Sequence, residues 1–111
     1  MSKLDTVALR GRSGETYKFN VYPMDTNFNA VGAVYVVSRR SKNQEVKKYQ
    51  YRILYVGETG DLSTRFDDHH KADCFAQNKA NCICVHRDDD QVYRLFIEND
   101  LTKLWNPPCN D

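Results

Sequence analysis

Residues 31–38 read VGAVYVVS and residues 51–56 read YRILYV, and these two runs decide the fold. Both are rich in β-branched and aromatic residues and have the length of buried strands. The segment between them, RRSKNQEVKKYQ, has the composition of a connecting loop and not of a crossover helix. We therefore expect the two strands to pair as antiparallel neighbours.

The remaining chain predicts further elements on both sides of this pair. Residues 7–22 contain two short strand-like pieces around GRSG, and the second piece alternates polar and apolar side chains, which predicts a β-hairpin. Downstream, the spacing of apolar residues predicts a short helix over 62–71, a third core strand over 82–86 and a long helix over 91–104. The expected fold class is α+β: a small central antiparallel β-sheet of three core strands flanked by helices, with an extra N-terminal β-hairpin. Residues 1–30 would form that hairpin extension and its connecting loop, and residues 31–111 the main domain.

Composition narrows the function. The 111 residues include 16 basic and 15 acidic side chains, so the net charge of +1 gives no general attraction to a polyanion. Six basic residues gather in and beside the loop between the two central strands and form the only concentrated positive patch. No apolar run approaches the roughly 20 residues that span a bilayer, and the N-terminus lacks a signal-peptide core. We expect a soluble, cytoplasmic protein without a membrane partner.

Four cysteines allow two disulfides or a metal site. Because no export signal is present, reduced thiols in the core are the favoured interpretation. A zinc site is the less favoured alternative, because structural zinc ligands usually come in closely spaced pairs. It would be built from Cys82, Cys84 and His86 on one strand face, together with Cys74, His69 or His70.

The long helix carries one carboxylate that does not fit its pattern. Tyr93, Ile97, Leu101 and Leu104 form an apolar stripe predicted to face the sheet, with Asp100 and Lys103 pointing outward. Glu98 lies at the margin of the stripe, where an unpaired charge is costly. It is either a metal ligand or the partner of Arg94 in an ion pair, and spacing alone favours the ion pair.

Arg65 and His69 are four residues apart and would share one face of the short helix. A guanidinium beside an imidazole suits a phosphate group. The alternative, favoured without other information, is a solvated face in a highly charged segment. Tyr35 and Tyr55 interrupt aliphatic strands, and ordinary core packing would suffice to explain them.

Read together, these residues resemble the GIY-YIG nuclease family. Gly32 followed by Ala33-Val34-Tyr35 is similar to the first signature, and Tyr55-Val56-Gly57 to the second. Arg65 follows Gly57 by eight residues and His69 follows by four more. The segment LFIENDLTKLWNPPCN is similar to the family's final helix, above all in the N-terminal nuclease domain of excision-repair endonucleases. The resemblance covers residues 31–110, which would make residues 31–111 a GIY-YIG-like nuclease domain. It departs from the pattern at Ala33, at Cys109 and in a longer loop between the signatures.

The resemblance implies a metal-dependent endonuclease that hydrolyses phosphodiester bonds of nucleic acid, DNA more than RNA. The alternative is a non-catalytic nucleic-acid or protein-binding module with the same fold. In the nuclease, Tyr35 would act as general base and Arg65 would bind the scissile phosphate. His69 would relay a proton, and Glu98 would hold Mg²⁺ or Mn²⁺.

Three groups of residues would support this site. Tyr55 and Asn110 would position water or phosphate beside Gly57. The basic loop is the candidate contact with the nucleic-acid backbone. A protein partner or a homodimer bound through the N-terminal hairpin stays open. The six basic residues of the loop are Arg39, Arg40, Lys42, Lys47, Lys48 and Arg52.

Overall fold

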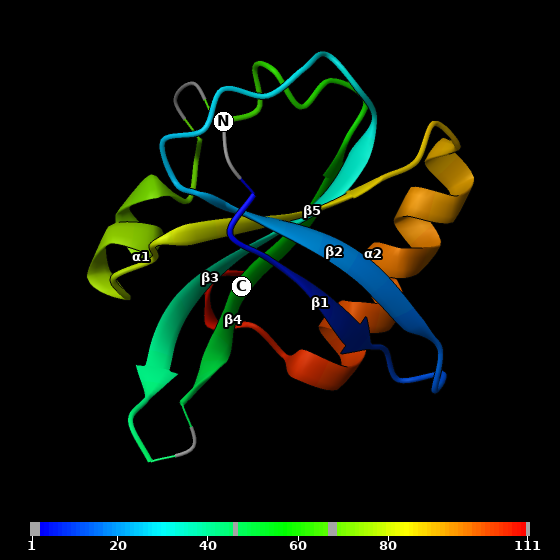
Figure 1. Cartoon of the computed structure of the whole chain (residues 1–111). Helices are drawn as coiled ribbons and strands as arrows, with labels where there is room; N and C mark the ends of the chain where they lie inside the picture. Colours follow the sequence, from blue (N-terminus) through cyan, green and yellow to red (C-terminus); the bar gives the residue numbers. More distant parts are fainter. Residues whose placement is uncertain (1–2, 46, 67–68, 111) are drawn as a thin grey trace.

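The computed structural model describes residues 3–45, 47–66 and 69–110. Five antiparallel strands form one sheet in the order β1-β2-β5-β3-β4 (Figure 1). The strands are β1 (Asp5–Arg10), β2 (Thr16–Pro23), β3 (Ala33–Asn43), β4 (Lys48–Thr59) and β5 (Cys82–Arg87). The helices are α1 (Ala72–Gln77), α2 (Gln91–Trp105) and the 3₁₀ helix η1 (Pro108–Asn110).

The predicted fold class is wrong. The N-terminal hairpin forms as expected, but β2 pairs with β5 from Asn20↔Val85 to Pro23↔Cys82, so the hairpin completes the same sheet. The result is a sheet-rich half-barrel with 41% of its described residues in strands and 23% in helices, not an α+β domain with three core strands. The physical reason is that β5 is an inner strand. Its backbone donors and acceptors pair with β3 along one edge, and those along the other edge need a partner, which β2 provides.

The central pair β3–β4 is confirmed as antiparallel and is longer than predicted. Pairing runs from Ala33↔Thr59 to Asn43↔Lys48, so most of the basic segment expected to be a loop extends the two strands. A register shift between Val37 and Ser38 leaves one extra residue in β4. Such a bulge changes which side chains of β4 face each side of the sheet.

The two faces of the sheet bury different clusters. One face packs Val34, Val36 and Val56 against Ile97 and Leu101 of α2. The other face is covered by the segment after β4, by α1 and by η1. Its buried side chains include Tyr35, Val37, Tyr55, Ile83, Leu62 and Phe75.

The predicted helix over 62–71 is wrong. Residues 62–66 form turns, residues 67 and 68 lie outside the described residues, and the first helix begins only at Ala72. Asp61 accepts a hydrogen bond from the amide of Ser63 at 3.0 Å, which closes a local turn instead of capping a helix. The amide of Leu62 donates to the carbonyl of Val31 at 2.9 Å, which anchors this segment to the chain before β3.

The predicted bounds of helix α2 are confirmed almost to the residue. The prediction of which of its side chains are buried and which are exposed is partly wrong. Asp90 caps its start by accepting from the amide of Val92, and Asn106 ends it in the left-handed conformation. Ile97 and Leu101 are buried, whereas Tyr93 is 40% and Leu104 41% exposed. Asp100 is also not outward, because its side chain is buried against the β1–β2 turn.

The cysteines divide into two pairs. Cys82 and Cys84 are buried free thiols, as predicted, but Cys74 and Cys109 form a disulfide, so the expectation of reduced thiols is wrong for that pair. The fold brings their Cα atoms to 5.9 Å, within the range that a disulfide bridges. The Nδ1 atom of His86 contacts the carbonyl of Lys18. In the part of the chain that the structure describes, no three or more His, Cys, Asp or Glu side chains form a cluster that could hold a metal ion. None of the described helices is long and apolar enough to cross a membrane.

Candidate active site

Tyr35 is fully buried on β3, and its phenol lies against β4 at Gly57, its cross-strand neighbour. A β-carbon at position 57 would lie 2.5 Å from the Tyr35 hydroxyl and 2.8 Å from Cε2 of Tyr55. Only glycine therefore permits this approach of the phenol to the backbone. The two tyrosine rings are 6.0 Å apart and belong to one aromatic cluster.

His69 binds the phenol directly, with 3.0 Å between its Nε2 and the Tyr35 hydroxyl oxygen. Its other nitrogen, Nδ1, accepts a hydrogen bond from the amide of Lys71 at 3.0 Å. A neutral imidazole has one N–H, so the proton is on Nε2, and His69 donates to the phenol oxygen. Burial, together with the nearby charge of Arg65, lowers the pKa of His69 to about 4, so the ring is neutral at pH 7.

This tautomer of His69 does not suit the proton relay predicted for this residue. Because Nδ1 is occupied by a backbone amide, the imidazole does not offer a path for a proton from Tyr35 to solvent in this arrangement. Instead, its Nε2–H favours negative charge on the phenol oxygen. The rings of Tyr55 and Phe75 fix the imidazole, with centroids 5.2 and 5.0 Å away.

Arg65 lies over the ring of Tyr35. Its Cζ is 5.6 Å from the centroid of the Tyr35 ring. Burial and the neighbouring Tyr55 raise the pKa of Tyr35, and the positive charge of Arg65 opposes that rise. A phenol titrates near pH 10, so a tyrosine that acts as general base near neutral pH needs a lowered pKa, and the protein alone does not provide it.

Glu98 of α2 lies within electrostatic reach of Arg65 and Glu58. Its side chain is half-buried, and burial followed by the charge of Glu58 raises its pKa, while Arg65 lowers it. Arg94 makes its salt bridge with Glu58, with 3.0 Å between Nε and Oε1, and not with Glu98. The ion pair expected between Glu98 and Arg94 is therefore wrong for this structure.

Glu58 is the site residue that sequence reasoning missed. It follows Gly57 directly, and its position beside that glycine was the only signal that could have pointed to it. Its carboxylate and that of Glu98 repel each other, which a cation between them would relieve. Mg²⁺ is commonly held by one or two carboxylates, with waters and phosphate oxygens completing the shell. This donor set fits such an ion.

Asn110 has a role in the fold of the site. Its amide nitrogen donates to the carbonyl of Val56, and its side-chain oxygen accepts from the amide of Val56, both at 2.9 Å. These two hydrogen bonds attach η1 to β4 at Val56, the residue between Tyr55 and Gly57. Asn110 therefore supports the strand instead of facing a ligand with a free amide.

The basic residues predicted to contact nucleic acid lie along the β3–β4 hairpin. Arg39 and Arg52 are cross-strand partners and line an open pocket of about 310 Å³. Side chains alternate along a strand, so Arg39 shares a face with Tyr35, about 13 Å away. Arg40 lies on the other face, where its Cζ is 3.5 Å from the Tyr49 ring centroid and its Nε donates to Tyr51. The hairpin lysines, Lys42, Lys47 and Lys48, are exposed.

The site therefore gathers five predicted residues from separate segments: Tyr35, Tyr55, Arg65, His69 and Glu98. Tyr35, His69 and Glu98 each have a neighbour in the stretch of β4 from Tyr55 to Glu58, and Arg65 lies over the ring of Tyr35. Comparisons with protein-family models, with curated protein sequences and with solved structures found no match.

Proposed function

We propose that this chain is a metal-dependent endonuclease of the GIY-YIG type, which hydrolyses phosphodiester bonds of nucleic acid, DNA more than RNA. The observation that carries the proposal is the contact of Tyr35 with both His69 and Arg65, with Glu98 within the electrostatic reach of Arg65. The guanidinium of Arg65 lies within electrostatic reach of both the phenol of Tyr35 and the carboxylate of Glu98, and the three residues come from different segments of the chain. They are the groups that phosphodiester hydrolysis requires.

In this mechanism, Arg65 binds the scissile phosphate and stabilises the charge that develops on it. The phenol of Tyr35 first gives its own proton to a solvent water molecule, and the phenolate oxygen then accepts the proton of the attacking water. Two donors favour the resulting phenolate: the Nε2–H of His69 and the guanidinium of Arg65. Because burial raises the pKa of Tyr35, the free protein is expected to be nearly inactive until a substrate and an ion complete the site.

Glu98, with Glu58 beside it, would hold the magnesium or manganese ion. The bound ion would supply charge neutralisation at phosphorus and at the leaving oxygen. Glu58 stays oriented by Arg94, so its carboxylate can support the ion without moving. Arg39 and Arg52 would contact the nucleic-acid backbone on the same face of the sheet.

The decisive experiment is cleavage of labelled duplex, single-stranded, flap and branched DNA and RNA in Mg²⁺ or Mn²⁺. Glu98→Gln should abolish cleavage and leave the thermal melt nearly unchanged, because a half-buried carboxylate with a raised pKa tolerates a neutral isostere. Glu15→Gln, at an exposed position in the β1–β2 turn, is the matched control and should cleave normally.

Tyr35→Phe tests the base separately. It keeps the ring and removes the oxygen, so cleavage should fall by roughly 10²–10⁴, the usual contribution of general acid–base catalysis. Binding without cleavage by the unsubstituted protein on every substrate would refute the nuclease and favour the non-catalytic binding module. Cleavage that survives in both variants would show that the activity comes from another site or a contaminant.

A further inference from the structure

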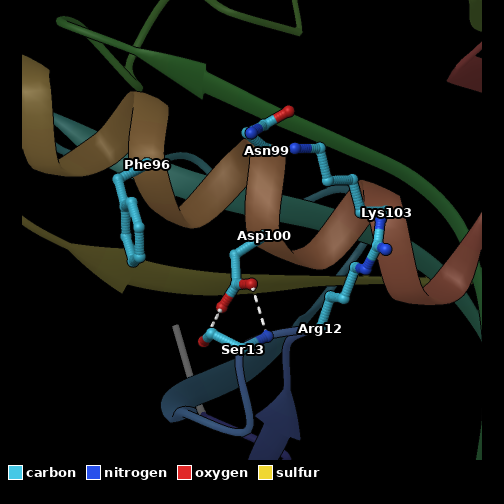
Figure 2. A pocket seen from close by; sticks show the side chains of 6 residues that line it. All are labelled: Arg12, Ser13, Phe96, Asn99, Asp100 and Lys103. Carbon is cyan, nitrogen blue, oxygen red and sulfur yellow. Dashed lines mark hydrogen bonds between the residues drawn. The ribbon is translucent and has the colours of Figure 1, made fainter.

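A pocket lies between α2 and the β1–β2 turn, on the flank of the helix opposite Glu98 (Figure 2). Its volume of about 340 Å³ is within the range of small-molecule sites, roughly 300–1,000 Å³. Phe96 and Lys103, which both line it, are seven residues apart, close to two helical turns, and share this flank. Glu98 follows Phe96 by two residues, which turns its side chain to the other flank. The pocket is therefore separate from the candidate active site.

The β1–β2 turn is attached to α2 at Asp100, which places Arg12 at the pocket. The carboxylate of Asp100 accepts from the amide of Ser13 at 2.8 Å and from its hydroxyl at 2.7 Å. The amide of Arg12 donates to the carbonyl of Asp100 at 3.1 Å. A β-carbon at Gly11 would overlap the Asp100 carboxylate, so this close approach requires glycine. The backbone of the turn is therefore in place before any ligand binds, which lowers the entropic cost of binding.

One side of the pocket is basic. The side chain of Arg12 extends to α2 beside Lys103, and Asn99 lies next to Lys103 (Figure 2). Among the described residues, neither Arg12 nor Lys103 is in a salt bridge. The carboxylate of Asp100 already accepts three hydrogen bonds, two from Ser13 and one from a tyrosine hydroxyl. Two positive charges against one negative charge leave this side able to bind an anion.

The other side of the pocket is aromatic. The side chain of Phe96 is 49% exposed, and its ring is parallel to that of Tyr93, with centroids 6.3 Å apart. An exposed aromatic ring offers its face for stacking with a planar ring of a ligand. Ser13 and Asp100 lie between Phe96 and Arg12 (Figure 2). A ligand that fills the pocket would therefore join a planar ring to an anionic group across Ser13.

We propose that this pocket binds a phosphate monoester that carries an aromatic ring, such as a nucleoside monophosphate. The phosphate oxygens would accept from Arg12, Lys103 and Asn99, and the base would stack on Phe96. A doubly charged phosphate matches the two cations better than a carboxylate does, and the guanidinium fork binds two of its oxygens. The same chemistry occurs in a free nucleotide and at the phosphorylated end of a nucleic-acid strand. The proposal uses none of the residues of the proposed nuclease site.

Calorimetric titration of the full chain with adenosine monophosphate, adenosine and ribose 5-phosphate tests the ligand chemistry. Adenosine monophosphate should bind saturably, and the other two should each bind about ten-fold more weakly or less, because each lacks one of the two contacting groups. Because the pocket exists only in the folded chain, the bound nucleotide should also raise the melting temperature. The absence of saturable binding, or equal binding by ribose 5-phosphate or adenosine, would overturn the proposal.

Two variants locate the bound nucleotide. Lys103→Gln and Phe96→Ala each change an exposed side chain, so the protein should melt near its usual temperature. Each variant should bind adenosine monophosphate about five-fold more weakly or less, through the loss of one charged hydrogen bond or of the stacking surface. Lys18→Gln, at an exposed position of β2 outside the pocket, is the matched control and should bind normally. Equal weakening by Lys18→Gln would mean that general charge, and not the pocket, attracts the nucleotide.

Glu98→Gln separates this proposal from the nuclease. This variant should bind adenosine monophosphate normally, whether or not the unsubstituted protein cleaves nucleic acid. Weaker binding by Glu98→Gln would place the nucleotide in the candidate active site and refute the pocket.

Short strands with and without a 5′-phosphate distinguish the two sources of the ligand. Displacement of adenosine monophosphate by the phosphorylated strand alone would assign the pocket to strand ends. Displacement by neither strand would assign it to free nucleotides, with the proposed chemistry unchanged. Equal displacement by both strands would mean that the terminal phosphate is not recognised, which would overturn the proposal.

Discussion

Gly57 has no side chain, and this permits the central contact of the candidate site. Gly57→Ala would add a methyl group 2.5 Å from the Tyr35 hydroxyl and 2.6 Å from its Cζ, both in a fully buried ring. The ring cannot retreat without breaking its contact with His69. We expect cleavage to be lost and the free energy of unfolding to fall by about 1–3 kcal/mol, the usual range for overpacking. Cleavage rates and chemical denaturation measure the two effects.

Gly60→Ala is the matched control for this substitution. A β-carbon there would meet only Nη2 of Arg94, at an ordinary contact distance of 3.8 Å. This variant should keep both stability and cleavage. Normal cleavage by Gly57→Ala would show that the phenol does not need its position against β4.

Asp100 links α2 to the β1–β2 turn through three hydrogen bonds, from the amide and hydroxyl of Ser13 and from Tyr17. Hydrogen bonds from Tyr17, then from Ser13, lower the pKa of Asp100. Since the folded state has the lower pKa, the stabilisation is present above the unfolded value near 4 and is lost as pH falls through the folded value.

Asp100→Asn should therefore lower the stability at pH 7 by about 1–3 kcal/mol, because an amide satisfies these donors less well. The difference from the unsubstituted protein should shrink as the pH falls below 4. Thermal melts of both proteins across pH 2–8 measure it. A difference that is constant with pH would mean that the charge of Asp100 contributes nothing.

At the scale of elements, local patterns predicted the strands and the long helix well. The alternation in residues 16–22 and the apolar runs that became β3 and β4 report backbone preferences directly. The short helix failed because Leu62 and Phe66 have helical spacing, yet the Leu62 amide bonds to Val31, a contact that no local pattern encodes. The pairing of β2 with β5 joins segments about 60 residues apart and was not visible for the same reason.

The candidate site was likewise predicted in part, and its long-range contacts were not. The resemblance to a nuclease family, and not the spacing of each residue alone, predicted that Tyr35, Arg65, His69 and Glu98 come together. The sequence could not reveal that Arg94 pairs with Glu58, because that contact crosses from α2 to β4. Nor could it reveal the burial that raises the pKa of Tyr35. Contacts and burial belong to the assembled sheet.

The disulfide joins two small elements at the edge of the site. Cys74 of α1 and Cys109 of η1 are 35 residues apart, and η1 attaches to β4 through Asn110. A loop of this length predicts a stabilisation of roughly 3–4 kcal/mol from the restricted unfolded chain. Reduction should lower the melting temperature and, by loosening η1, also reduce cleavage.

A variant with Cys74→Ser and Cys109→Ser serves as the control for reduction. It should behave like the reduced protein, and a reducing agent should then have no further effect. Melting curves with and without the agent, with thiol titration, measure this. If the double variant still responds to the agent, the response comes from another group, such as the buried thiols of Cys82 and Cys84.

For the whole molecule, a net charge of +1 means that any attraction to nucleic acid depends on where the charges lie. The sheet separates them: Arg39 and Arg52 share the face of Tyr35, whereas Arg40 and Lys42 alternate to the other. Arg40 is also held by Tyr49 and Tyr51. Only some of the six predicted basic residues are therefore expected to contact the substrate.

Arg39→Gln and Lys42→Gln each remove one charge, from opposite faces of the same strand, and so test this separation. The binding constant for a labelled duplex is measured from low to moderate salt. Its logarithm should fall linearly with the logarithm of the salt concentration. For Arg39→Gln the slope should be shallower by about 1, the change expected for one lost phosphate contact, whereas Lys42→Gln should leave it nearly unchanged. Equal changes in both variants would mean that the nucleic acid follows the end of the hairpin instead of the face of the sheet that contains Tyr35.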